Sequence, residues 1–430
     1  MKDQYQMERK VEDERDKMEW SWKRIWGRRL THGKEMETSL IRKLKFQANK
    51  GTLPSNYQQR RKNTFTSSKC KQLPMEQLVS CGKSPGGAKC LEEFKYYFNK
   101  EGELRHMDTN EPFVFNYYKN EPERNHKRYQ VLGHMITQYV YELLEKECEL
   151  QKVHIPLDAQ SNEPQSCFFM SKEALTNPLS LIILLQDYGV VRAGQWGQKT
   201  IIHHGLDQGT QIPFIKIAKK EYGGIIVLNP NDNFLEMKVE EPEMTLIKKE
   251  SSLSTENDQD TAMCNKQLIP KRCCSTAEEH TIYVWDHFIS KSLAKKVAFI
   301  THGYGGLTFV DLLMRRKEVM SKVFAVAFID SKHNTQHQVG DNAEVQDWIR
   351  KHCKSWVLSS KALDRPTGSV LRLDCPRVSA GTENHELAPF CSLQPIFRFL
   401  SRSSEPKTNA VNSRTRMVTR SSVRNKNPIE

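Results

Sequence analysis

The sequence predicts an α/β fold in which a mostly parallel sheet is covered by helices on both faces. Two observations predict it. Several short runs are apolar throughout, as expected of strands buried on both faces, and they occupy residues 179–185, 224–230, 297–300 and 323–329. Segments whose apolar residues repeat at helical spacing separate these runs, and such alternation is typical of strand–helix–strand units. The chain of 430 residues is long enough for one such domain with added segments.

Residues 1–90 read as a basic, largely disordered N-terminal arm. Residues 1–72 carry a net charge of +10, and Trp20, Trp22 and Trp26 lie among lysines and arginines. A solvated, disordered tail is the simpler interpretation of this composition. RNA contact through the basic tails is the alternative, because arginines pair with phosphates and indole rings stack on bases.

The folded domain is expected over residues 91–400. It begins with aromatic residues at the alternate positions 94, 96 and 98, which a Lys-Glu-Gly turn follows. This pattern is typical of a β-hairpin. The remaining elements are predicted from the spacing of apolar residues. They recur every second residue in a half-exposed strand and every third or fourth residue in a helix. In order, we predict a hairpin over 94–107, a helix over 125–150, strands at 153–156, 167–170, 179–185 and 224–230, a helix at 212–220, a helix over 282–289, a strand at 297–300, a helix over 307–314, a strand at 323–329, a helix over 345–353, a strand at 378–382 and a last helix after residue 385.

Two segments lack any periodicity. Residues 236–278 are rich in acidic residues, lysine and serine, and we expect a disordered insertion that interrupts the domain. Residues 401–430 are rich in serine and arginine, carry a net charge of +5, and read as a disordered basic tail. Because the whole chain has a net charge of +13, the central residues 73–400 are close to neutral.

A strand, a tight turn and a helix follow one another between Lys295 and Arg316, with the turn at Thr301 to Gly306. This is the layout of a nucleophile elbow, in which a G-x-S-x-G turn raises a serine above the sheet of an α/β hydrolase. The fold class is therefore predicted to be α/β-hydrolase-like. The residue at the apex, however, is Gly303, which tolerates the turn but has no oxygen for attack.

The order of the remaining residues matches a degenerate catalytic triad. Asp330 follows the next strand and His385 follows a later one, so Asp330 is placed to orient an imidazole and His385 to act as a general base. Each residue alone also fits an ordinary turn or helix-start position. Gln186 and Asp187 follow the strand at 179–185, where an oxyanion loop is expected, and a carboxylate there would oppose a developing negative charge.

Long sequence blocks extend this pattern into a family resemblance. The chain resembles the Argonaute-binding-protein-two domain family, α/β-hydrolase-fold proteins that include a vertebrate cotranscriptional regulator, and it looks like a diverged paralogue of that member. The blocks that carry the resemblance are residues 111–117, 139–146, 189–196, 283–288 and 375–382.

The resemblance implies a nuclear protein, also present in the cytoplasm, that contacts Argonaute and chromatin- or splicing-associated proteins in heterochromatin formation, RNA silencing or alternative splicing. Two departures from the family pattern imply a pseudoenzyme. The family elbow reads His-Ser-Tyr-Gly-Gly, whereas Gly303 replaces the serine here, and Gln186-Asp187 replaces the family's His-Gly. A Gly303→Ser variant is expected to regain labelling by a fluorophosphonate probe if the rest of the turn is intact.

No cofactor, metal site or membrane segment is expected. The 11 cysteines form no C-x-x-C pair, His333 and His337 lack a third ligand nearby, and no apolar run reaches the length of a membrane span. Two alternatives to a noncatalytic role stay open. They are a residual serine-hydrolase-like esterase or amidase, which uses water activated by His385 and Asp330, and a degraded duplicate with no retained function.

Overall fold

The computed structural model describes residues 87–238, 266–368 and 374–405, all within one unit that comprises residues 73–430. The predicted arm up to residue 86, the centre of the predicted insertion and the predicted tail from residue 406 lie outside the described residues.

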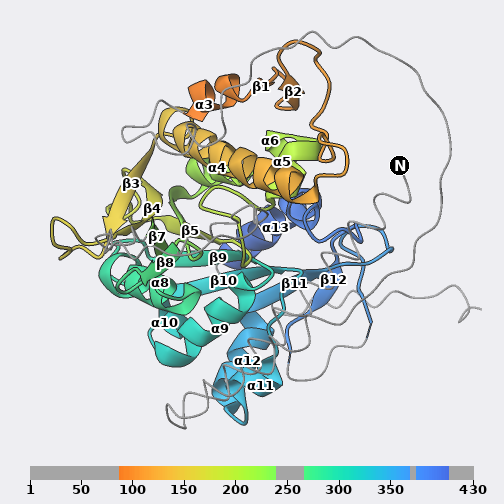
Figure 1. The fold of residues 1–430 in the computed structure, drawn as a ribbon. Coiled ribbons are helices and arrows are strands. Elements are labelled where there is room, and N and C mark those ends of the chain that lie inside the picture. Colours follow the sequence, from red (N-terminus) through yellow and green to blue (C-terminus); the bar gives the residue numbers. More distant parts are fainter. Residues whose placement is uncertain (1–86, 239–265, 369–373, 406–430) are drawn as a thin grey trace, which may run out of the picture. The chain divides into compact units, whose positions relative to one another are not determined.

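An eight-stranded sheet forms the centre of the fold (Figure 1). Its strands lie in the order β12-β11-β10-β9-β5-β6-β4-β3, and β4 alone runs opposite to the other strands of this sheet. This mixed, mostly parallel sheet confirms the predicted α/β-hydrolase-like fold. The bounds are β3 (Leu150–Ile155), β4 (Ser166–Ser171), β5 (Ser180–Leu185), β6 (Gly223–Val227), β9 (Lys296–His302), β10 (Val323–Ile329), β11 (Cys353–Val357) and β12 (Arg377–Ser379).

Helices cover both faces of this sheet (Figure 1). One face carries α4 (Pro122–Lys146), α5 (Gln198–His204), α6 (Leu206–Gly209), α7 (Ile212–Glu221) and α13 (Ala388–Ser404). The other face carries α8 (Ala277–Val284), the π-helical turn η1 (Trp285–Ile289), α9 (Gly305–Arg315), α10 (Val319–Lys322), α11 (Thr335–Val339) and α12 (Ala343–His352). None of the described helices is long and apolar enough to cross a membrane.

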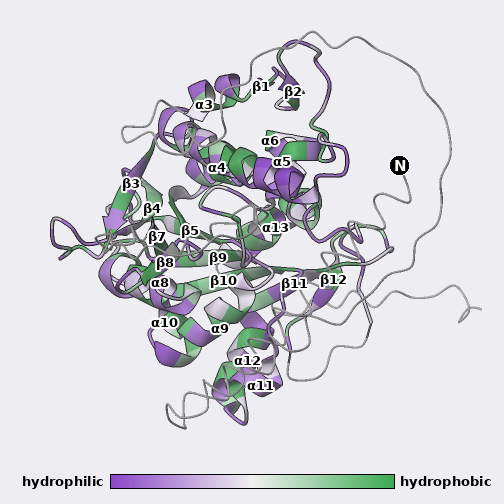
Figure 2. Cartoon of the chain, viewed as in Figure 1, coloured by the Kyte–Doolittle hydropathy of each residue, from purple (hydrophilic) through white to green (hydrophobic). Residues whose placement is uncertain are grey.

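The two faces bury separate hydrophobic cores because successive side chains of a strand point to opposite sides. In β5, Ile182 and Leu184 join the core beneath α4 and α13, whereas Leu181 and Ile183 join the core beneath α8 and α9. Figure 2 shows the matching pattern in the helices, where green and purple residues share one helix such as α4. The sheet is therefore fixed from both sides, and the loops at the carboxyl ends of its strands are held in place.

Three smaller elements lie outside the main sheet. The helix α3 (Gly87–Glu93) precedes a predicted hairpin, which is formed by β1 (Tyr96–Phe98) and β2 (Leu104–His106). The strands β7 (Phe234–Lys238) and β8 (Lys266–Pro270) pair antiparallel. The last three residues of β7, all of β8 and the start of α8 lie within residues 236–278, where a disordered insertion is predicted, so regular structure extends into both ends of that range.

Other boundaries also shift. The first described helix, α3, begins at Gly87, before the predicted start of the folded domain at residue 91, and α13 continues to Ser404, past the predicted end at residue 400. The strand β11 was not predicted. Its short sequence, Cys-Lys-Ser-Trp-Val, lacks a continuous apolar run, and its place is fixed by parallel pairing with β10 and β12.

Candidate functional site

The elbow turn joins β9 to α9 at the carboxyl edge of the sheet. Gly303 has a φ of +53°, in the left-handed region that favours glycine, and its N–H donates to the carbonyl of Ile329 over 3.0 Å. At Gly305, a Cβ atom would lie 2.6 Å from the carbonyl oxygen of Leu185. The missing side chain at Gly305 thus lets the start of α9 approach the end of β5, which brings the loop after β5 to the apex.

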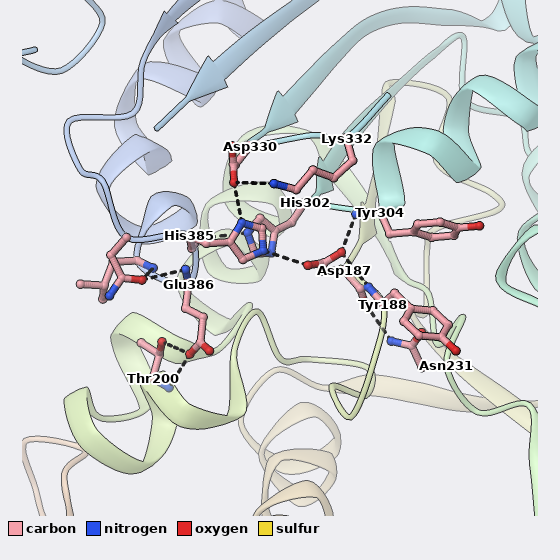
Figure 3. A network of polar contacts seen from close by, with 12 residues as sticks. Asp187, Tyr188, Thr200, Asn231, His302, Tyr304, Asp330, Lys332, His385 and Glu386 are labelled. Atoms are coloured by element: carbon pink, nitrogen blue, oxygen red, sulfur yellow. Dashed lines mark hydrogen bonds and ion pairs between the residues drawn. The ribbon is translucent and has the colours of Figure 1, made fainter. Parts of the chain in front are cut away.

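Asp330 lies directly after β10, the neighbour of β9. Its backbone is also left-handed, with a φ of +39°, and its N–H donates to the carbonyl of Trp356 over 2.7 Å. One carboxylate oxygen, Oδ2, is 2.6 Å from Nδ1 of His385 and 3.6 Å from Nζ of Lys332. The turn after β10 therefore aims Asp330 at the imidazole (Figure 3).

His385 lies between β12 and α13, and both of its ring nitrogens contact a carboxylate (Figure 3). Nδ1 contacts Asp330, and Nε2 lies 2.8 Å from Oδ2 of Asp187. In a serine triad, Nε2 would instead face the nucleophile. In the described part of the chain, no hydroxyl or thiol is hydrogen-bonded to this imidazole.

The carboxylate of Asp187 occupies the place where a serine side chain would stand. A Cβ atom on Gly303 would lie 2.2 Å from both Cγ and Oδ1 of Asp187 and 2.4 Å from Oδ2, far closer than non-bonded atoms come. Oδ1 accepts a hydrogen bond from the N–H of Tyr304, over 2.5 Å, and another from the N–H of Tyr188, over 2.8 Å. The N–H after the apex residue is the one that serves as an oxyanion donor in α/β hydrolases.

These contacts set the protonation of the cluster. Burial opposes the charged form of His385, but hydrogen bonds to Asp187 and Asp330 and their negative charges raise its pKa to about 9. Burial likewise opposes ionisation of Asp187, yet its contacts with His385 and the Tyr304 N–H hold the pKa of this carboxyl well below its usual range. At neutral pH the cluster is an imidazolium between two carboxylates.

His302, the last residue of β9, lies beneath this cluster. Its ring stacks on His385 with 4.2 Å between ring centroids, and its Nε2 lies 3.1 Å from the His385 carbonyl. The side chain is fully buried, and this burial, together with the charge of His385, lowers the pKa of His302 to about 3. His302 is therefore neutral and supports the ring of His385 from below. In the sequence His302 begins the block His-Gly-Tyr-Gly-Gly, and nothing in that block indicates the stacking on His385.

The other polar side chains near the apex are buried or hydrogen-bonded to other groups. The hydroxyl of Tyr304 donates to Glu278 over 2.9 Å, and Thr301 is fully buried. Gln186 is also buried, and its side-chain amide makes no hydrogen bond to any described residue. Glu386, next to His385, accepts hydrogen bonds from the N–H and hydroxyl of Thr200, which ties the His385 loop to α5 (Figure 3).

Two clusters among the described residues have the side chains and spacing of a metal site. The first consists of Asp187, His302 and His385, but their two imidazole rings are stacked at an angle of 23°, so their lone pairs do not converge. The second consists of His333, Asp374 and Cys375.

In this second cluster, one oxygen of Asp374 already contacts His333, Thr335 and the Cys375 N–H, over 3.3, 3.1 and 2.8 Å. Burial raises the pKa of the Cys375 thiol above its usual range, which disfavours the thiolate that a metal would need. His337, the partner of His333 in the sequence pattern, is exposed on α11.

The structure thus brings Gly303, Asp330 and His385 together at one edge of the sheet, and it adds Asp187 to them from the loop after β5.

Comparison with known proteins identifies the family. A sequence model described as the Arb2 domain matches residues 88–363, more than half of the chain. The chain belongs to the Arb2 domain family.

Relatives in this family are similar over most of the chain. The human protein ARB2BP is 52% identical over 366 residues, which cover 82% of this chain and 99% of the relative. The human cotranscriptional regulator ARB2A is 46% identical over 345 residues, which cover 75% of this chain and 82% of the relative. Among solved structures, a histone deacetylase from Saccharomyces cerevisiae matches with a TM-score of 0.39 and 16% identity over 64% of this chain and 98% of that chain.

Proposed function

We propose that this Arb2 domain protein is a noncatalytic α/β-hydrolase-fold member of nuclear gene regulation that acts through protein–protein contacts. The observation that carries the proposal is the position of the Asp187 carboxylate, which fills the side-chain volume at Gly303 and contacts Nε2 of His385. The nucleophile is absent, and the base that would activate it is occupied.

The charge of His385 supports the same conclusion. A general base needs an unprotonated nitrogen, but both nitrogens of His385 face carboxylates and its pKa is raised to about 9. In triad enzymes the loss of the nucleophile costs roughly 10⁶ in turnover, equivalent to about 8 kcal/mol of barrier. Here the nucleophile is replaced by a carboxylate that already accepts the N–H of Tyr304.

The regulatory part of the proposal is supported by relatives that are named cotranscriptional regulators. By extension from the family, we propose a nuclear location, with some protein in the cytoplasm, and contacts with Argonaute and with chromatin- or splicing-associated proteins in heterochromatin formation or cotranscriptional splicing control. The basic tails, which lie outside the described residues, are proposed to add contacts with RNA.

The test of the regulatory role is affinity capture of the full chain from nuclear extract, with quantitative identification of the captured proteins. We expect Argonaute or chromatin and splicing factors above a bead control, and equally so with His385→Gln, because the contacts do not need site chemistry. Absence of these factors from both captures would count against the proposal. Loss of salt-sensitive RNA binding on deletion of residues 1–72 and 406–430, which leaves α13 intact, would test the tails separately.

One observation favours a second candidate, a residual esterase or amidase. The 2.6 Å contact between His385 and Asp330 retains the base–acid half of a triad, which could orient water if Asp187 moved away. Turnover of short-chain acyl esters by the purified protein, abolished by His385→Ala, would support this enzyme and contradict the noncatalytic proposal. We expect no such turnover and no labelling by a fluorophosphonate probe.

A further inference from the structure

The Asp187 carboxylate is bound as an external anion would be. Oδ1 accepts two backbone N–H groups, from Tyr304 and Tyr188, and Oδ2 contacts Nε2 of His385. Each oxygen has its own donors, which is the arrangement that charge-assisted hydrogen bonds favour for a carboxylate. The site thus holds a carboxylate group in a defined position, and in this protein that group is the side chain of Asp187.

The carboxylate fits because Gly303 has no side chain, since a Cβ atom there would overlap Cγ and both oxygens of Asp187. One wall of the site is the backbone of the elbow turn, and the other is the imidazole of His385, which is fixed by Asp330 and by stacking on His302. Both walls also have contacts that do not involve Asp187, such as the hydrogen bond from the Gly303 N–H to the Ile329 carbonyl.

We propose that the elbow of this protein is a binding site for a small carboxylate, and that Asp187 fills this site from within the chain. Asp187 then acts as an internal ligand that keeps external carboxylates out. This inference rests on the contacts of Asp187 and does not depend on the gene-regulatory role.

Two substitutions of Asp187 empty the site, and they leave spaces of different size. Asp187→Gly removes a methylene and the carboxylate, which together match acetate. Asp187→Ala removes only the carboxylate, which matches formate, and its remaining methyl group would collide with the methyl group of acetate. Acetate should therefore bind the glycine variant, and formate should bind the alanine variant in preference to acetate.

Thermal unfolding of the full-length variants measures this binding, because a ligand of the native state alone raises Tm. The titrations use sodium acetate, sodium formate and sodium chloride at equal ionic strength, below the ordinary histidine pKa of about 6.5. We expect a saturable rise in Tm of about 2 to 4 °C with the matched carboxylate. We expect no such rise with chloride, none in the unmutated protein, and none when His385→Gln is added to either variant.

Equal responses to acetate and chloride, or an equal response in the unmutated protein, would overturn the proposal. If the truncated variants do not fold, ¹⁵N NMR of the unmutated protein decides, because a carboxylate seated on Nε2 requires both nitrogens of His385 to carry protons at neutral pH. An unprotonated Nε2 there would also refute it. Capture of regulatory partners is read out independently, so either proposal can fail without the other.

Discussion

The carboxylate of Asp187 and the absent side chain of Gly303 occupy the same volume, with the Cβ position of residue 303 only 2.2 Å from the Asp187 Cγ. A side chain at residue 303 and an aspartate at residue 187 are therefore mutually exclusive in this geometry. Gly303 in the elbow and Asp187 in the loop after β5 are therefore parts of a single structural feature.

This relationship corrects the expectation for Gly303→Ser. The single variant should not regain fluorophosphonate labelling, because the new side chain would overlap Asp187 and would also sit at a φ of +53°. We expect it to lower the free energy of unfolding by about 2 to 4 kcal/mol, from backbone strain together with overpacking. Urea denaturation measures this cost.

The double variant Gly303→Ser/Asp187→Gly provides the control. Removal of the carboxylate leaves only the backbone strain, so the cost of the serine should fall by at least about 1 kcal/mol in this background. The double variant also frees His385 to face the new hydroxyl, and we expect it to react with the probe. Additive effects of the two substitutions would show that residues 187 and 303 do not compete for space.

The sequence was sufficient to predict the sheet apart from β11, the elbow and the order of Gly303, Asp330 and His385, because buried strands and a glycine-rich turn leave strong local patterns. It also indicated that Asp187 is incompatible with an oxyanion. It could not place Asp187 against Gly303, because residues 187 and 303 meet only through the parallel pairing of β5 with β9 and the close approach of α9 to Leu185. Non-local contacts of this kind have no periodic signature.

Above neutral pH, the free energy of unfolding should fall as His385 loses its proton. Its pKa is raised from 6.5 to about 9 in the folded protein, so its stabilising contribution is complete below pH 6.5 and is lost as the pH rises through 9. The loss should reach up to about 3 kcal/mol in the free energy of unfolding. Urea denaturation at several pH values measures it, and His385→Gln should flatten this part of the profile. A wild-type profile that is already flat over this range would contradict the charged cluster.

Below pH 6.5, the free energy of unfolding should fall because some histidines are buried in the neutral form. Burial lowers the pKa of His302 to about 3 and that of His280, a fully buried residue of α8, to about 4. The unfolded chain therefore takes up protons below pH 6.5 that the folded protein does not. Each histidine should cost about 1.4 kcal/mol per pH unit between pH 6.5 and its folded pKa. Stability from His302 and His385 together is thus greatest near pH 6.5. His302→Asn should reduce the acid slope in urea denaturation, and an unchanged slope would exclude this assignment.

Asp330 contacts two cationic side chains, the largely buried His385 and the half-exposed Lys332, and the contributions of these two contacts to stability can be compared. Asp330→Asn leaves His385 with one carboxylate in a largely buried site, where the aspartate side chain is only 13% exposed, and we expect a loss of about 2 to 3 kcal/mol. Lys332→Ala removes a cation that is 50% exposed and 3.6 Å away, and we expect a loss below about 1 kcal/mol. Urea denaturation at neutral pH ranks the two variants. NMR titration should show a lowered His385 pKa in Asp330→Asn but not in Lys332→Ala, and similar effects of both variants would mean that Asp330 does not hold the imidazolium.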